Sequence, residues 1–199
     1  MEKDPLIDDA LKGELSALYQ AADRHYHNLA HIKAMLALAG EYRALLDDPD
    51  AVEAAIWFHD AIYDSRAKDN EAKSAEMAEK SLAGRASSER LARIVAMINA
   101  TATHQVPSLR DERALNDAAL LLDMDLAILG AEPDAFDAYE KAVRLEYGWV
   151  EEPMWRAGRA AVLKSFLGRP HIFHTQSFRD RFDARAKENL GRSLQALQN

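Results

Sequence analysis

The chain has 199 residues, of which 48% are apolar and 29% charged, and these proportions predict a folded protein with a sizeable core. Its formal net charge of −8 disfavours a nucleic acid polymer as partner, because the protein and the phosphates would repel each other. The chain has no cysteine, no basic and apolar leader, and no apolar run near the roughly 18–20 residues of a membrane span, so we expect a cytoplasmic protein without membrane contact, disulfides or thiolate ligands.

Nine segments in succession carry apolar residues at three-to-four spacing on an alanine-rich background, which is typical of amphipathic helices. They are residues 5–22, 29–46, 51–63, 70–83, 88–101, 114–130, 133–147, 153–168 and 177–197. The breaks between them are short, and neither period-two alternation nor an internal repeat interrupts the series. The sequence therefore predicts an all-α fold of eight or nine helices, forming a single domain over residues 1–199.

The third segment contains a histidine and an aspartate, His59 and Asp60, directly after five apolar residues. His59 falls on one helical stripe with Val52 and Ile56, so we expect the pair to lie at or beside the core. An ionised aspartate can be buried there only if it is ion-paired, hydrogen-bonded or bound to a metal. For an isolated pair of this kind, a capped or salt-bridged aspartate beside a core histidine is the usual explanation.

Two further groups of polar residues require partners of the same kind. Asn28 is a good N-cap, and it would place His31 in the first turn of the second helix with His27 just before it. The spacing of these histidines matches a zinc protease motif, but Asn28 stands where that motif needs a glutamate, which excludes that interpretation. Asp123 and Asp125 interrupt a strongly apolar segment, and they lie about 200° apart on a helix, so both can hardly face one ion.

The order of these residues resembles the HD superfamily of metal-dependent phosphohydrolases. The likeness extends from about residue 24 to residue 190, over the segments "RHYHNLAHI", "AIWFHDAIYD", "NEAKSA", "TATH", "DMDLAILG" and "ARAKENL". Together, these segments resemble one subgroup of predicted HD phosphohydrolases. The resemblance implies that His31, His59, Asp60 and Asp125 bind a metal. Asp125 is preferred to Asp123 because the late aspartate of the family directly precedes a leucine.

Two imidazoles and two carboxylates would hold one divalent ion and leave positions open for water and substrate, as catalytic sites do. Nitrogen and oxygen ligands suit Mn, Fe, Co, Ni or Zn, and the sequence does not distinguish among them. A second metal, near His104, is less expected. The implied function is hydrolysis of a phosphoester or phosphoanhydride of a small metabolite or nucleotide by a metal-activated water.

Four residues are candidates for contact with the substrate or the attacking water. Arg24 could hold a phosphate through its guanidinium fork, or form a surface salt bridge. His27 could contact the substrate or protonate the leaving group, or be an exposed histidine without a role. Glu71 could orient or deprotonate the water, or stabilise the start of its helix. His104 could bind the substrate or approach the metal.

Two other functions remain open on the same scaffold. One is a di-iron oxygenase, which would need more histidine ligands than the sequence places with the metal. The other is a metal-containing protein that binds and senses a nucleotide without turnover.

A homodimer is possible. Near the end of the chain we expect Arg185 and Asn189 to fasten the last helix by hydrogen bonds.

Overall fold

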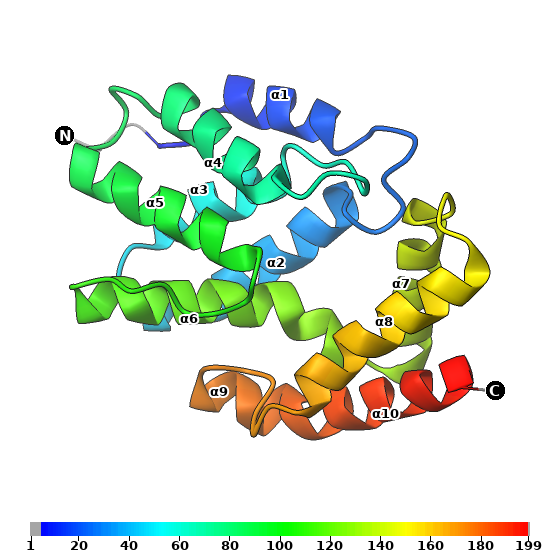
Figure 1. The fold of residues 1–199 in the computed structure, drawn as a ribbon. Coiled ribbons are helices and arrows are strands. Elements are labelled where there is room, and N and C mark those ends of the chain that lie inside the picture. Colours follow the sequence, from blue (N-terminus) through cyan, green and yellow to red (C-terminus); the bar gives the residue numbers. More distant parts are fainter. Residues whose placement is uncertain (1–4, 199) are drawn as a thin grey trace. The chain divides into compact units, whose positions relative to one another are not determined.

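The computed structural model describes residues 5–198, and within this range every regular element is helical (Figure 1). Nine of the helices in the described range have ten or more residues, so the prediction of an all-α fold with eight or nine helices is confirmed. Regular strands are absent from these residues, which contain one isolated bridge between Ala83 and Ala86. No helix between residues 5 and 198 combines the length and the apolar character needed to cross a bilayer.

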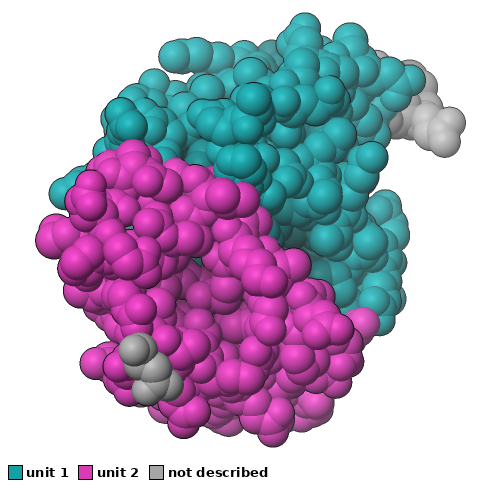
Figure 2. All heavy atoms as spheres, turned by 90° about the vertical axis from the view of Figure 1, so that its right-hand side faces the viewer, with its two compact units in different colours: residues 1–124 teal, residues 125–199 magenta. Residues whose placement is uncertain are grey.

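Contacts within the chain define two compact units, Met1–Met124 and Asp125–Asn199, which Figure 2 colours teal and magenta. The division falls inside one continuous helix, α6 (Glu112–Leu126), so Asp125 is carried by the last turn of a helix that begins in unit 1. The single domain expected from the sequence stays a prediction.

Unit 1 is organised around α3, which packs against α1, α2, α4 and α5. Seven of the ten residues of α3 are buried, so this helix is apolar around most of its circumference, as expected of a central helix. The elements of unit 1, besides the larger part of α6, are α1 (Asp9–Leu18), α2 (Leu29–Glu41), the 3-10 helix η1 (Arg43–Leu45), α3 (Pro49–Phe58), α4 (Asn70–Ser81) and α5 (Ser88–Thr101).

The start of α3 is fixed by charged side chains from two other helices. Asp48 is the N-cap, and its carboxylate accepts the N–H of Ala51 at 3.1 Å and forms an ion pair with Arg90 of α5. Asp117 of α6 accepts the backbone N–H of Asp48 at 2.9 Å, and also that of the preceding residue. These contacts satisfy donors that the first turn of a helix leaves free, and they define where α3 begins.

Unit 2 contains the C-terminal elements, in which α10 packs against α8 and η2. Asn189 of α10 donates to the carbonyls of Leu129 and Ala131 at 2.9 Å each, and Arg185 pairs with Glu132 at 2.8 Å. The fastening role predicted for Arg185 and Asn189 is therefore confirmed. The elements are η2 (Ala127–Gly130), α7 (Pro133–Glu146), α8 (Glu152–Leu167), α9 (Gln176–Phe178), the π-helix η3 (Arg179–Asp183) and α10 (Ala184–Gln198).

Candidate metal centre

The first histidine of the centre is positioned by the N-terminus of α2. Asn28 caps this helix as predicted, because its side-chain oxygen accepts the N–H of Ala30 at 2.8 Å, while its amide nitrogen donates to the carbonyl of His25 at 2.8 Å. His31 consequently lies in the first turn of α2, where it is buried with 7% of its surface exposed.

The second histidine and its neighbouring aspartate lie at the end of α3 and not inside it. The helix ends at Phe58, so the prediction of a helix that continues to residue 63 was wrong. His59 still has helical backbone angles and donates its N–H to the carbonyl of Ala55 at 2.9 Å, whereas Asp60 is in the turn that follows. Both residues are buried, with 1% and 8% of their surfaces exposed respectively.

The protonation of the neutral His59 ring follows from one contact. Its Nδ1 atom lies 2.9 Å from the carbonyl oxygen of Ile56, and a carbonyl can only accept a hydrogen bond. The proton of the neutral ring is therefore on Nδ1, and the lone pair is on Nε2. A backbone partner on one ring nitrogen is the arrangement that orients histidine ligands in metal sites.

Three candidate ligand atoms of unit 1 lie around one point. The Nε2 atom of His59 is 3.0 Å from Oδ2 of Asp60 and 3.2 Å from Nε2 of His31, and the third side of this triangle is 3.9 Å. Ligands about 2.1 Å from one ion are about 3.0–3.4 Å apart when they subtend angles near 90–110°. A lone pair and a carboxylate oxygen 3.0 Å apart repel each other, and a proton between the two atoms or a bound cation would remove this repulsion.

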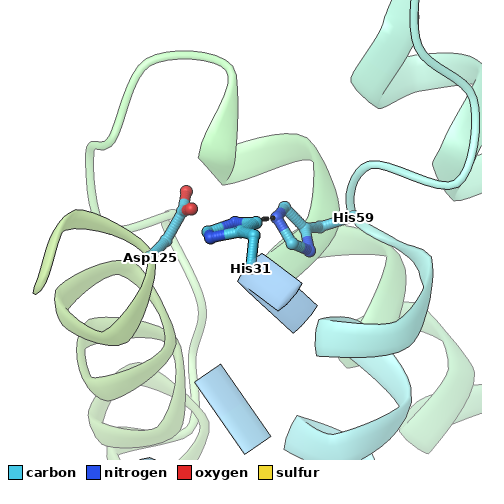
Figure 3. A group of neighbouring side chains, drawn as sticks. All are labelled: His31, His59 and Asp125. Carbon is cyan, nitrogen blue, oxygen red and sulfur yellow. Dashed lines mark hydrogen bonds between the residues drawn. The ribbon is translucent and has the colours of Figure 1, made fainter. Parts of the chain in front are cut away.

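Asp125, in the last turn of α6, lies near the two histidines. In Figure 3 its carboxylate faces the ring of His31, and a dashed line joins the rings of His31 and His59. One candidate ligand atom from each of these three residues lies within 4.8 Å of the other two, so the group could hold a metal ion. Asp123, the alternative considered from the sequence, is fully buried and does not belong to this group.

Arg24 is buried beneath the turn that carries Asp60, with 9% of its surface exposed. Its Nη1 atom donates to the carbonyls of His27 and Asp60 at 3.0 and 2.6 Å, and its Nη2 atom donates to the carbonyl of Ala61 at 2.8 Å. The guanidinium also lies over the ring of Tyr63, 5.5 Å from its centre. The surface salt bridge considered for Arg24 is thus not what the structure shows, and phosphate binding stays a prediction.

The other candidate residues occupy separate positions around unit 1. The ring of His27 stacks on that of Tyr63 with centres 4.4 Å apart, and its centre is 6.3 Å from that of His31. Glu71 lies in the first turn of α4, as expected, and is half-exposed. His104 lies three residues beyond the end of α5 with a φ of 51°, in the left-handed region that few residues other than glycine adopt. The roles proposed for these three residues stay predictions.

Two supporting residues of α4 were not identified from the sequence, although both belong to the segment "NEAKSA". The hydroxyl of Ser74 accepts the N–H of Ile62 at 3.0 Å and lies 3.3 Å from the carbonyl of the same residue. The side chain of Asn70 bonds both the N–H and the carbonyl of Asp64, at 3.1 and 2.9 Å. Their signal was the presence of small polar residues on the buried face of a helix, which indicates hydrogen bonds to the main chain.

Comparison with models of protein families, with curated proteins and with solved structures found no match for this chain. The resemblance to the HD superfamily therefore rests on the sequence motifs, and the function depends on the chemistry of the site itself.

Proposed function

We propose that this chain is a metal-dependent phosphohydrolase of the HD type, acting on a phosphoester or phosphoanhydride of a small metabolite or nucleotide. The observation that supports it most strongly is the triangle formed by His31, His59 and Asp60. Two ring nitrogens and a carboxylate oxygen lie 3.0–3.9 Å from one another there, and the tautomer of one ring directs its lone pair toward the other two atoms. Asp125 would complete the set as a second carboxylate.

A divalent transition metal held by these four residues would supply two functions, because it acidifies a bound water and polarises a phosphoryl oxygen. The chain's own residues would do the remaining work. The second carboxylate oxygen of Asp60 would orient the attacking water. His27, held by its stacking on Tyr63, would protonate the leaving group, and Glu71 is the candidate base.

Metal analysis combined with a phosphate-release screen tests this proposal. Protein purified without chelator should contain about one equivalent of Mn, Fe, Co, Ni or Zn per chain, and should release phosphate from at least one member of a panel of nucleotides and sugar phosphates. Chelation should stop the release, and returning the metal should restore it. His31→Gln should abolish both metal binding and release. The matched control is His25→Gln, which alters an exposed histidine near the same helix and should leave both unchanged.

Three outcomes would contradict the proposal. A protein without bound metal that also fails to take up Mn²⁺, Co²⁺ or Zn²⁺ would exclude a metal centre. Tight metal binding and nucleotide binding without phosphate release across the panel would favour a sensing protein. Two irons per chain with consumption of oxygen would favour an oxygenase.

A further inference from the structure

The end of α3 and the turn after it expose carbonyls that no later helical N–H reaches. Two side chains from the segment between α1 and α2 donate hydrogen bonds to these carbonyls. The hydroxyl of Tyr19 donates to the carbonyl of Trp57 at 3.0 Å, and Arg24 donates to those of Asp60 and Ala61 at 2.6 and 2.8 Å. A cation is well suited to this position because carbonyl oxygens converge at the C-terminal end of a helix.

Arg24 also contacts the second segment that carries a proposed ligand. Its third hydrogen bond, at 3.0 Å, goes to the carbonyl of His27, four residues before His31. One planar guanidinium therefore links the start of α2 to the turn that carries Asp60, next to His59. This buried group is hydrogen-bonded to both segments, although Arg24 and the Asp60 carbonyl are separated by 36 residues in the chain.

We propose that Arg24 is a positioning residue, which sets the distance between His31 and the His59–Asp60 pair and so determines the affinity and geometry of the metal centre. The proposal rests on the metal centre of the proposed function and does not depend on what is hydrolysed. It differs from the phosphate-binding role predicted for Arg24, in which the guanidinium contacts the substrate.

The surroundings of Arg24 favour positioning over direct contact with a phosphate. Three of the five N–H groups of the guanidinium are donated to backbone carbonyls. The group lies over two aromatic rings, with its centre 5.0 Å from that of Tyr19 and 5.5 Å from that of Tyr63, and 9% of the residue is exposed. The rings and carbonyls stabilise the buried cation, and they fix its plane relative to both segments.

Titration with Co²⁺ tests the proposal, because the visible absorption of this ion reports its coordination geometry. We expect Arg24→Gln to weaken Co²⁺ binding by about 10- to 100-fold, the range typical of residues that orient metal ligands, and to alter the absorption spectrum. The matched control is Tyr19→Phe. This change removes a buried hydrogen bond to the end of α3 and leaves in place the hydrogen bonds to the turn that carries Asp60. This variant should lower the melting temperature while its Co²⁺ affinity and spectrum stay within about 2-fold of wild type.

Circular dichroism on the same samples shows whether each variant is folded. If Arg24→Gln does not fold, Arg24→Lys provides the test, because its ammonium keeps the charge but cannot bridge carbonyls on both segments in the fixed plane of a guanidinium. It should fold and still show weakened Co²⁺ binding with an altered spectrum.

Two results would overturn the positioning role. One is a folded variant at Arg24 whose Co²⁺ affinity and spectrum are unchanged. If the KM of that variant for a phosphorylated substrate also rises, the phosphate role replaces the positioning role. The other is a wild-type protein that binds no Co²⁺, which also removes the metal centre. If wild-type protein binds Co²⁺, the Arg24 variants disturb that binding and no phosphate is released from any substrate, the positioning role stands and the hydrolase proposal fails.

Discussion

The Nδ1 atom of His59 lies 2.9 Å from the backbone carbonyl oxygen of Ile56, one turn earlier in the same chain segment, so the neutral ring carries its proton on Nδ1. The opposite nitrogen is left to face His31 and Asp60, at 3.2 and 3.0 Å. The carbonyl near the end of α3 thus fixes the proton on Nδ1 of His59 and the lone pair on Nε2, the atom that would bind a metal.

This tautomer can be observed directly in metal-free protein at a pH where histidine is neutral. Long-range ¹H–¹⁵N spectra of ¹⁵N-labelled protein should show a protonated Nδ1 and an unprotonated Nε2 for His59. The exposed His25 serves as the internal control, because water reaches its ring and interconverts its two tautomers. A spectrum in which His59 carries its proton on Nε2 alone would contradict the assignment.

The two late aspartates should respond differently to the same substitution. Asp125→Asn should weaken metal binding by more than the about 10- to 100-fold typical of residues that only orient metal ligands, because it removes a proposed ligand charge, and should change stability little. Asp123→Asn alters a fully buried carboxylate and should instead lower the free energy of unfolding by about 1–3 kcal/mol. Metal titration and denaturant unfolding of both variants check this contrast, and a reversed pattern would assign the ligand to Asp123.

Most of the fold was predictable because its signals are local. Asn28 and Ser87 cap the helices that follow them, and alanine-rich backgrounds allow the apolar spacing to mark nearly every helix to within a few residues. The end of α3 was not predictable in this way. Apolar residues continue past Phe58, and the turn is stabilised by Arg24 and Ser74 from other segments, whose hydrogen bonds to main-chain atoms leave no periodic pattern.

For the site, the sequence indicated which residues need partners but not how they meet. A buried His-Asp pair and aspartates in an apolar helix are conspicuous in any sequence. The distances among His31, His59 and Asp125 depend on how three helices pack, and residue spacing does not contain that information.

The start of α3 gives a prediction for pH dependence. Burial acts to raise the pKa of Asp48, but the hydrogen bonds from Arg90 and from the N–H of Ala51 outweigh it and hold that pKa below its usual value. The charged carboxylate therefore stabilises the fold above about pH 4, the unfolded pKa of aspartate, and this contribution is lost as the pH falls through the lower folded pKa.

Asp48→Asn isolates this effect, because asparagine is an equally good N-cap but cannot form the ion pair. The variant should lose about 1 kcal/mol of unfolding free energy at pH 7, a modest value because the pair is partly exposed. The difference from wild type should shrink as the pH falls below about 4. Denaturant unfolding at several pH values measures it, and a difference that grew toward acid would show that the charge of Asp48 is not stabilising.

The most direct test of the metal centre is Asp60→Asn, with bound metal, helicity and phosphate release measured on the same preparation. Asparagine preserves the size of the side chain but removes the charge that lies 3.0 Å from Nε2 of His59. If Asp60 is a metal ligand, the variant loses most of its metal and nearly all phosphate release while its helicity stays that of wild type. If Asp60 serves only as a salt-bridge partner of His59, the variant melts at a lower temperature but keeps its full metal content and normal turnover per folded molecule, and that result would contradict a metal centre built on Asp60.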